Sequence, residues 1–394
     1  MKKCIDDFNV FGKKVILRVD FNVPMNSNKV ITNDRKITES LPTINYLIEH
    51  EAKIILISHL GRPKGKVNNE FSLSPIAEQL RKYVKTNVFM SEGIICDDTR
   101  KKLRNLRNGE ILVLENIRFA PEEEANDEDF AKKLAYLGEI YCNDAFGTAH
   151  RAHASVAGIT KFLPSCCGFL MLKELEVFSS LMLNPERPYI AILGGSKVSD
   201  KIGLISKIIE RVDKLIIGGA MAYTFLTAID YNVGKSIVEQ NKLEFARLIL
   251  EKAKNLGVEV LLPFDHVVAN EFSILADYTV VDQTNFPDDW IGMDIGPKSA
   301  KLFAKEIALA KTVYWNGPMG VYEFKRFSKG TETIIKAMAR NPYKMIVGGG
   351  DSSAAVVSLG LENRFFHVST GGGASLELIE GNELPGIVNL QDKK

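Results

Sequence analysis

Several features are scarce or absent in this sequence of 394 residues. The longest apolar runs, such as residues 53–58 (KIILIS), have the length of a strand and are far too short to span a membrane. The first residues, MKKCIDD, lack the apolar segment of a signal peptide, and acidic side chains come too early for a transit peptide. These absences predict a protein that is neither exported nor embedded in a membrane.

Cysteine and net charge are also low. The five cysteines are an odd number, form no C-x-x-C pair, and include one adjacent pair, Cys166 and Cys167, which would rarely bond to each other. Reduced thiols and a cytoplasmic location are therefore predicted. The formal net charge of +1 provides no global field for nucleic acid or anionic lipid. Any anion site must be local.

Apolar, β-branched runs alternate with amphipathic stretches along the whole chain, a pattern typical of parallel sheets with crossover helices. A helical stretch at 172–183, ended by the breaker NPERP, separates two such series. Strands are predicted near 14–19, 53–58, 111–114 and 139–143, then near 189–193, 214–217, 258–262, 312–315, 344–347 and 365–369. Helices are predicted in much of 37–50, 74–85 and 127–137. The length and the two series indicate two α/β domains with a boundary at roughly 170–185.

The residues that follow each predicted strand differ between the halves. In open parallel sheets, ligands gather at the carboxyl ends of the strands. In the first half these ends carry basic and amide groups: RVDFN from Arg18, SHLGR from Ser58, ENIR from Glu115 and DAFGTAHR from Asp144. In the second half they are rich in glycine: GGSK from Gly194, GGA from Gly218, NGPMG from Asn316, GGGDS from Gly348 and TGGG from Thr370. The first half suits a small, strongly anionic molecule, and the second suits a nucleotide.

Four arginines of the first half, with His59, would converge on one rim of the predicted sheet. Arginine offers permanently charged, bidentate donors for phosphate and carboxylate. A single arginine is usually solvated surface, but repetition just beyond strand ends favours an anion site. The four are Arg35, Arg62, Arg118 and Arg151.

The stretch His150-Arg151-Ala152-His153 invites a zinc interpretation. Zinc normally needs three or four ligands of suitable spacing, and no cysteine or carboxylate completes this set. Histidines that donate hydrogen bonds near an oxyanion are the favoured interpretation.

None of the glycine loops fits the P-loop or the dinucleotide fingerprint. Even so, Gly348–Ser352 directly precedes a helix-like segment, so that backbone N–H groups and the helix dipole would face a phosphate. Residues 370–374 (TGGGA) repeat the design one strand later. Two interpretations of Asp351 remain open: it caps its own helix, or it reaches a magnesium ion held by nucleotide phosphates.

Lys197 and Lys201 lie four residues apart at a predicted helix start, hence on one helix face. Cations are unfavourable at that end of a helix, so an anionic ligand would explain them. Ordinary surface lysines remain the alternative.

Taken in order, these motifs closely resemble the phosphoglycerate kinase family from end to end. The resemblance is very specific, because so many long, ordered matches do not arise by convergence. Small departures are Ser353 and Tyr322, where Ala and Phe are usual, and neither touches a charged role. The matching stretches are RVDFNVP (18–24), SHLGRP (58–63), ENIRF (115–119), DAFGTAHRAHAS (144–155), GGSKV (194–198), LPFD (262–265), WNGPMG (315–320), GGGDS (348–352) and STGGGAS (369–375).

The resemblance implies two doubly wound parallel-sheet (Rossmann-like) α/β domains, 1–171 and 172–380, joined by a hinge helix with the active-site cleft between them. Residues 381–394 would return to the first domain. The phosphoglycerate site would comprise Asp20, Phe21, Asn22, Arg35, His59, Leu60, Gly61, Arg62, Arg118 and Arg151. The nucleotide site would comprise Lys197, Lys201, Gly292, Asn316, Glu323, Gly349, Gly350, Asp351 and Ser352.

The implied reaction moves a phosphoryl group between 1,3-bisphosphoglycerate and ADP, giving 3-phosphoglycerate and ATP, in a monomeric enzyme that uses Mg²⁺. Its nucleophile, a carboxylate, is already ionised at neutral pH, so no general base is needed. Catalysis then depends on alignment, domain closure and charge stabilisation. The candidate catalytic groups are Arg35, Lys201 and the backbone N–H groups of Gly350, Gly372 and Gly373, with Asp351 on Mg²⁺.

Two other functions can be compared with this one. A dinucleotide-dependent oxidoreductase needs the fingerprint loop, which is absent. A catalytically silent scaffold on the same fold would be favoured by loss of Arg35, Lys201 or Asp351, and all three are present.

Overall fold

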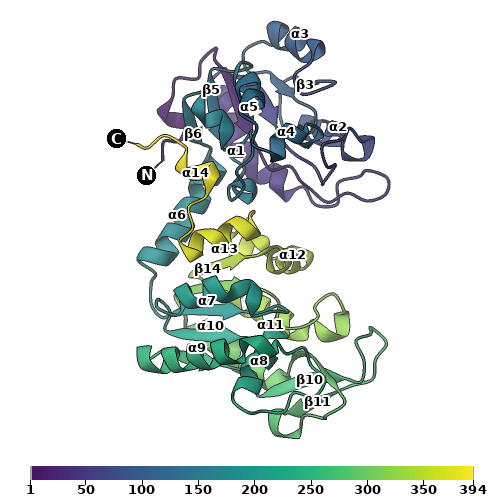
Figure 1. Ribbon diagram of the computed structural model, residues 1–394, viewed down its shortest axis with the longest axis vertical. Coiled ribbons are helices and arrows are strands. Elements are labelled where there is room, and N and C mark those ends of the chain that lie inside the picture. Colours follow the sequence, from purple (N-terminus) through teal and green to yellow (C-terminus); the bar gives the residue numbers. More distant parts are fainter. Residues whose placement is uncertain (1, 394) are drawn as a thin grey trace. The chain divides into compact units, whose positions relative to one another are not determined.

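The computed structural model describes residues 2–393, which form two compact units. One unit contains the residues up to Glu176 and those from Asn382 onward, and the other contains Val177–Gly381 (Figure 1). The division lies within helix α6 (Phe169–Leu183), slightly beyond the 171/172 position taken from the sequence. The helix therefore contributes residues to both units.

The first unit is built on a six-stranded sheet with the order β3-β4-β2-β1-β5-β6, in which every pair is parallel. Its strands are β1 (Lys14–Arg18), β2 (Lys53–Ile57), β3 (Val88–Met90), β4 (Ile111–Val113), β5 (Ile140–Asn143) and β6 (Ser165–Cys167). Its helices, apart from short 3-10 turns, are α1 (Arg35–Glu49), α2 (Ser74–Arg81), α3 (Asp97–Asn105), α4 (Pro121–Glu124) and α5 (Glu128–Ala135).

The central strands explain why the sequence shows continuous apolar runs. In β1 and β2 every residue after the first is buried, including Val15, Ile16 and Ile55. Strands covered by helices on both faces have no solvent side, so they show no alternation. The predicted strands at 14–19, 53–58, 111–114 and 139–143 are confirmed, whereas the short strands β3 and β6 were missed.

The last segment of the chain packs within the first unit. Gly386, in the short helix α14 (Pro385–Val388), donates its N–H to the Ala149 carbonyl at 2.8 Å, and its own carbonyl accepts from Asn143 Nδ2 at 2.9 Å. A Cβ atom on Gly386 would lie 2.9 Å from the Cα atom of Ala149. This close approach requires glycine at position 386.

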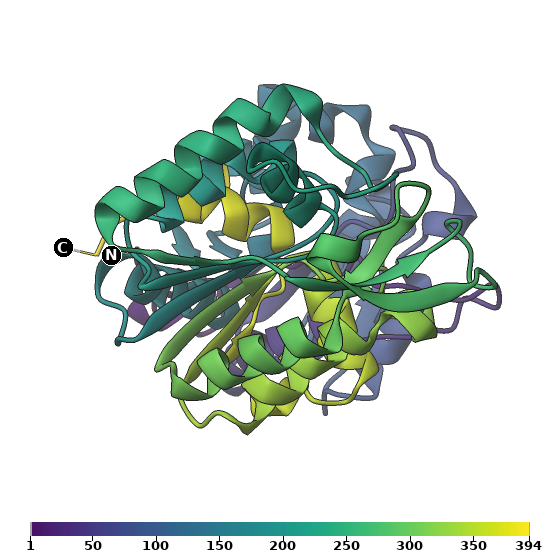
Figure 2. The same cartoon turned by 90° about the horizontal axis from the view of Figure 1, so that it is seen from below.

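The second unit has its own six-stranded parallel sheet, with the order β15-β14-β13-β7-β8-β9. Helices cover both faces of this sheet, as the edge-on view in Figure 2 shows. Its strands are β7 (Tyr189–Leu193), β8 (Lys214–Ile217), β9 (Glu259–Leu261), β13 (Thr312–Asn316), β14 (Lys344–Gly348) and β15 (His367–Val368). Its helices are α7 (Ile202–Ile208), α8 (Met221–Ala228), α9 (Leu243–Leu256), α10 (Pro297–Leu309), α11 (Lys329–Arg340), α12 (Gly350–Ser358) and α13 (Gly372–Glu380).

A small antiparallel sheet in the second unit was not predicted from the sequence. It has the order β11-β10-β12, formed by β10 (Asp265–Ala269), β11 (Tyr278–Asp282) and β12 (Ile291–Ile295). The edge strand β11 is largely exposed, so burial gave it no clear apolar pattern. Asp265, the first residue of the central strand β10, joins this sheet to α10, because its carboxylate accepts the N–H groups of Lys298 and Ser299 at the start of that helix. The two parallel-sheet domains predicted from the sequence are confirmed.

Among residues 2–393, no helix is both long and apolar enough to cross a bilayer.

Candidate functional site

Each sheet has one place where the strand order reverses along the chain. In the first unit this switch lies between β1 and β5, and in the second it lies between β7 and β13. Loops that leave neighbouring strands in opposite directions open a crevice at such a point, where ligands bind in open α/β sheets. Asp20 follows β1 at the first switch and Asn316 ends β13 at the second, whereas other candidates follow neighbouring strands, such as Arg118 after β4 and Gly349 after β14.

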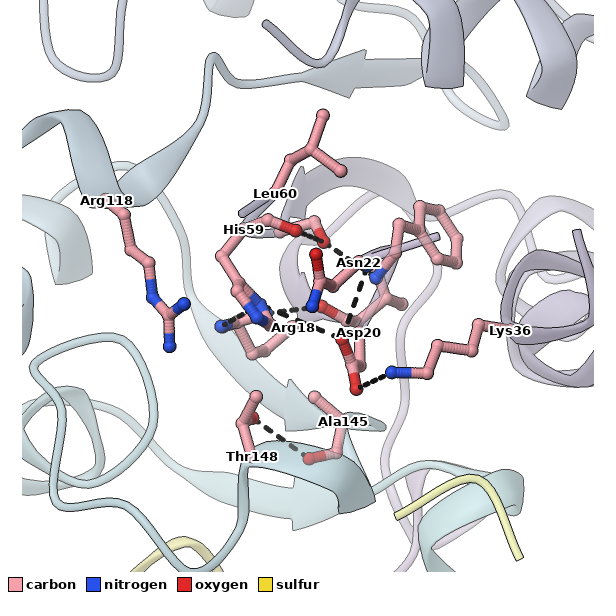
Figure 3. Close-up of polar contacts among 12 residues, drawn as sticks. Arg18, Asp20, Asn22, Lys36, His59, Leu60, Arg118, Ala145 and Thr148 are labelled. Atoms are coloured by element: carbon pink, nitrogen blue, oxygen red, sulfur yellow. Dashed lines mark hydrogen bonds and ion pairs between the residues drawn. The ribbon is translucent and has the colours of Figure 1, made fainter. Parts of the chain in front are cut away.

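The switch of the first unit holds a buried polar network (Figure 3). Asp20, two residues after β1, accepts Lys36 Nζ at 2.7 Å and lies 3.8 Å from His59 Nδ1. Arg18, at the end of β1, approaches the same His59 nitrogen at 3.4 Å and donates to Ser155 Oγ at 2.9 Å. Arg18 is completely buried, so this network is a rigid base beneath the strand ends.

The charges in this network are fixed by burial and by each other. Burial, helped by Arg18 and Arg118, holds the pKa of His59 well below its ordinary value despite the nearby Asp20 carboxylate. Burial alone would raise the pKa of Asp20, but Lys36, through its charge and its hydrogen bond, acts together with His59 and Arg18 to hold that pKa far below the usual range. His59 is therefore neutral and Asp20 ionised at neutral pH.

Arg118 has the features expected of a prepared anion site. Its side chain is buried, its Nε lies 3.2 Å from the Glu124 carboxylate, and it donates one hydrogen bond to the Gly61 carbonyl at 2.8 Å. Its Nη2, however, has no hydrogen-bond partner within the described chain. Burial and the nearby Arg151 lower the pKa of Arg118. A buried cation with an unsatisfied donor is costly unless an anion completes it.

The neighbouring histidines are neutral. Burial, then the repulsion of Arg118, lowers the pKa of His153 to about 4. Burial and Arg151 lower the pKa of His150, whose Nε2 accepts Arg151 Nε at 3.3 Å. Both rings can thus offer hydrogen bonds without adding charge.

The remaining candidates of the first unit differ in accessibility. Phe21 and Leu60 have buried side chains, so only their backbones can face a ligand. The exposed Asn22 accepts the N–H of Gly61 through Oδ1 at 2.9 Å and lines, with Leu60 and Gly61, a cavity of about 400 Å³. Arg62 is exposed, and the partly buried Arg35 begins α1, with its Nε 3.5 Å from Glu39.

Sequence reasoning missed two residues of this site, Arg18 and Lys36. Arg18 was noted as part of a motif, and its charge inside an apolar strand was the available signal. Lys36 follows Arg35 directly, and nothing in its spacing indicates that it pairs with Asp20.

In the second unit, Lys201 and Asn316 meet at the switch point. Lys201 Nζ donates to Asn316 Oδ1 at the end of β13, and Asn316 is itself buried. The loops carrying them interlock, because Gly194 N donates to the Asn316 carbonyl at 2.9 Å. Gly317 has φ of +95° and a Cβ there would lie 2.3 Å from the Gly194 oxygen, so only glycine fits.

Burial lowers the pKa of Lys201 to about 8, although Asp351 and Asp200 act in the opposite direction. The sequence placed Lys197 and Lys201 on one helix face, and that prediction is wrong. Lys201 is the N-cap of α7, while Lys197 lies before a separate 3-10 turn, Ser199–Lys201, and is exposed. Glu239, distant in sequence, holds this turn by accepting the N–H groups of Val198 and Ser199 at 2.5 and 3.0 Å.

The two glycine loops lie against each other after β14 and β15. A Cβ on Gly372 would lie 2.9 Å from the Gly350 nitrogen, so the N-termini of α12 and α13 are neighbours. The N-cap of α12 is Gly349, with φ of +88°, so the alternative that Asp351 caps this helix is wrong. Asp351 is exposed in the first turn instead, and Ser352 is buried and accepts the N–H of Gly317 at 2.6 Å.

A cavity of about 260 Å³ adjoins these loops and brings three sequence candidates together: Gly292, Glu323 and Asp351. Its walls also include Tyr223, Phe272 and Met319, which were not predicted from the sequence. Tyr223 and Phe272 lie in segments without a motif, and Met319 lies in a motif that was noted only for its glycines. A Cβ on Gly292 would collide with the Tyr223 hydroxyl. An apolar wall beside helix N-termini suits a molecule with a flat apolar body and an anionic end.

Within residues 2–393, no group of three or more His, Cys, Asp or Glu side chains is arranged to hold a metal ion by itself. The chemistry available is therefore that of the groups above: fixed cations and amides in both units, and two exposed carboxylates, Glu323 and Asp351, in the cavity that adjoins the glycine loops.

Known proteins resemble this chain along nearly its whole length. The family model described as phosphoglycerate kinase matches residues 5–382. Named phosphoglycerate kinases of Dictyoglomus turgidum and Clostridium kluyveri are 52% and 50% identical to this chain, covering 98% and 100% of it and 98% and 99% of the relatives.

Solved structures give the same result. The phosphoglycerate kinase of Coxiella burnetii is 40% identical and matches with a TM-score of 0.87, over 99% of this chain and 98% of that one. The enzyme of Pyrococcus horikoshii is 31% identical and matches with a TM-score of 0.85 over the same shares.

Proposed function

This chain belongs to the phosphoglycerate kinase family and catalyses phosphoryl transfer between 1,3-bisphosphoglycerate and ADP, and we propose that each of its two units binds one of the substrates. The phosphoglycerate binds at the β1/β5 switch of the first unit, and the nucleotide binds at the β7/β13 switch of the second.

One observation carries this division: Arg118, which is buried and keeps an unsatisfied Nη2 beside its ion pair with Glu124, lies in one unit, and the paired helix N-termini lie in the other. Arg118, Arg151, Asn22 and the neutral His59 supply directional donors for a small carboxylate and phosphate. Arg35 and Arg62 complete the set as more accessible cations, together with Asp20 and the backbones of Phe21, Leu60 and Gly61. In the second unit the adenine base occupies the cavity at Gly292, with Glu323 at the ribose and the phosphates directed toward Lys197, Lys201, Asn316 and Gly349–Ser352.

Mg²⁺ fits this site because Asp351 is an exposed oxygen ligand beside the loops that would hold the phosphates. Mg²⁺ in proteins is usually held by one or two carboxylates together with substrate phosphates. When bound, it would neutralise charge on the nucleotide phosphates. No other protein ligand is required.

Catalysis follows from alignment rather than from proton transfer. The attacking carboxylate of 3-phosphoglycerate is ionised at neutral pH, and the neutral His59 is not needed as a base. Arg35, Lys201 and the N–H groups of Gly350, Gly372 and Gly373 stabilise charge on the moving phosphoryl group. Because the two binding regions belong to different units, transfer requires hinge bending that brings them in line and excludes water.

We also propose that the protein is a monomer that acts in the cytoplasm, without nucleic-acid or membrane partners. All five cysteines are unpaired thiols, as expected where glutathione keeps thiols reduced. Each unit carries its own substrate site, so a second copy of the chain contributes nothing to the proposed reaction.

Nucleotide binding should become coupled to proton uptake at alkaline pH. In the free enzyme Lys201 loses its charge above about pH 8, whereas a bound phosphate restores the charge by raising this pKa. Affinity for MgADP should therefore fall as pH rises above about 8, with close to one proton taken up per nucleotide at about pH 9. Calorimetry in buffers of different ionisation enthalpy measures this uptake. Lys201→Arg should abolish it and the matched Lys197→Arg should not; no uptake in the unmodified enzyme would refute the placement of Lys201.

Asp351→Asn should raise the Mg²⁺ concentration needed for half-maximal turnover by about 10-fold or more, since it removes the anionic ligand and keeps the shape. Binding of 3-phosphoglycerate should be unchanged, because Asp351 lies in the other unit. Glu362→Gln, which alters a carboxylate outside the cavity, is the control. An unaltered Mg²⁺ dependence in Asp351→Asn would show that the carboxylate does not contact the ion.

A further inference from the structure

The second unit contains another cavity, of about 440 Å³, which shares no wall residue with the cavity at Gly292. It lies between the antiparallel sheet and helices α10 and α11. Its size falls in the range of pockets that enclose small organic ligands. Its wall residues are Val267, Tyr278, Val280, Ile295, Pro297, Ala300, Lys301, Ala304, Arg326, Lys329, Gly330 and Thr333.

The floor of this cavity is apolar. Val267 and Ile295 belong to β10 and β12 and are buried, and Ala300 of α10 is buried in the same core cluster as Ile295. On the open side, Tyr278 and Val280 of β11 are 47% and 49% exposed. These two side chains form an apolar wall that a ligand could remove from water, and the favourable free energy of this burial is proportional to the apolar area covered.

The rim carries three cations and no acid. Lys301 and Lys329 are exposed, and Arg326 is half-buried and lies 5.5 Å from the centre of the Tyr278 ring. None of the three forms an ion pair with any residue in the range 2–393. Two acids on the adjoining elements are already engaged: Asp282 pairs with Lys298 at 2.6 Å, and Glu332 pairs with Lys336 at 3.0 Å.

Two helices begin at this cavity, and a buried carboxylate already accepts N–H groups at each start: Asp265 accepts those of Lys298 and Ser299 in α10, and Asp294 accepts that of Gly330 in α11. Pro297 is the first residue of α10, and Lys329 and Gly330 are the first two residues of α11. The positive potential of the rim therefore comes from its three cations, Lys301, Arg326 and Lys329, which surround one apolar cavity.

We propose that this cavity is a second ligand site, which takes a small monocarboxylate with a compact apolar body. The apolar body lies on Val267, Val280 and Ala300, and the carboxylate lies at the rim among Lys301, Arg326 and Lys329. Arg326 donates from Nη1 to the Ala276 carbonyl at 2.9 Å and lies over the Tyr278 ring, and its remaining N–H groups can donate to the carboxylate. Because the two cavities have separate walls, the ligand binds alongside the nucleotide rather than in its place.

Naphthalene-2-carboxylate is a suitable probe, because its neutral carboxamide has nearly the same shape. Calorimetric titration of the full-length enzyme should detect one site for the carboxylate, and the carboxamide should bind about 10-fold or more weakly, as expected for loss of a charge-assisted contact. Saturating MgATP should leave the carboxylate affinity unchanged. Displacement by MgATP, or equal affinity of the two probes, would overturn the proposal.

Variants on α10 make the test specific. Lys301→Gln should weaken carboxylate binding by about 10-fold, whereas Lys305→Gln, an exposed lysine on the same helix outside the cavity, should not. Ala304→Trp should fill the cavity and abolish binding, with kinase turnover retained as evidence of folding. If Lys305→Gln has the same effect as Lys301→Gln, or the filled cavity still binds the probe, the site does not exist as described.

Discussion

Gly372→Val should lower kcat by more than about 100-fold, the loss expected when backbone donors no longer meet charge in the transition state. A Cβ at this position would lie 2.9 Å from the Gly350 nitrogen and 3.1 Å from the Gly349 Cα atom. The larger side chain must therefore push apart the two helix N-termini whose N–H groups are proposed to surround the phosphoryl group. Steady-state kinetics in the direction that consumes ATP measures the loss.

Measuring the binding of each substrate separately distinguishes a loss of transition-state stabilisation from general damage to the fold. MgADP should bind the variant with a Kd raised by no more than about 10-fold, because the displaced N–H groups act mainly on charge that develops during transfer. Binding of 3-phosphoglycerate to the first unit should be unchanged. A Kd for MgADP that rises as far as kcat falls would mean that the loop only binds nucleotide.

Arg35→Ala should also depress kcat by about 100-fold or more, while the affinity for 3-phosphoglycerate changes much less. Arg35 begins α1 and is partly buried, with its Nε 3.5 Å from Glu39. Its proposed task is to bridge the substrate carboxylate and the transferring phosphoryl, a contact made only in the transition state. Separate measurement of kcat, KM and binary affinity tests the assignment.

Two variants serve as controls for Arg35. Arg35→Lys keeps the charge but loses the planar fork, so it should recover only part of the rate. Arg100→Ala removes another arginine with a local ion pair, Arg100 to Asp97 at 2.9 Å, and should leave kinetics unchanged. If Arg35→Ala raises KM and spares kcat, Arg35 is a binding residue.

The main strands were predictable because burial on both faces leaves long apolar runs. β1 and β2 are of this kind, and both were located to within a residue. β11 was missed because it is exposed at the edge of a separate sheet, so its alternation carries no burial signal. β3 and β6 were missed for lack of a buried run of β-branched residues and not for their length, since β4 is equally short and was predicted. β3 is partly exposed, and β6 consists of Ser-Cys-Cys.

Residues of the candidate site could be predicted where a charged or polar side chain follows a strand. They could not be predicted where their role depends on contact with a residue distant in the sequence. Arg118 follows β4 closely, and its unsatisfied Nη2 agrees with the anion role expected for it. Lys36 was missed because its partner, Asp20, is fixed by the packing of α1 against the sheet. The helix face expected for Lys197 and Lys201 was wrong because Glu239 holds a separate turn there.

The claim that phosphoryl transfer relies on groups from both units can be tested most directly by ¹⁹F NMR of the enzyme with 3-phosphoglycerate, MgADP and a planar metal fluoride. In the unmodified enzyme the fluorines should give separate, protected resonances, each shifted by a different set of neighbouring donors. Arg35→Ala, from the first unit, and Gly372→Val, from the second, should each remove or shift the resonances while the binary complexes persist. Unchanged fluorine spectra in both variants would contradict the account.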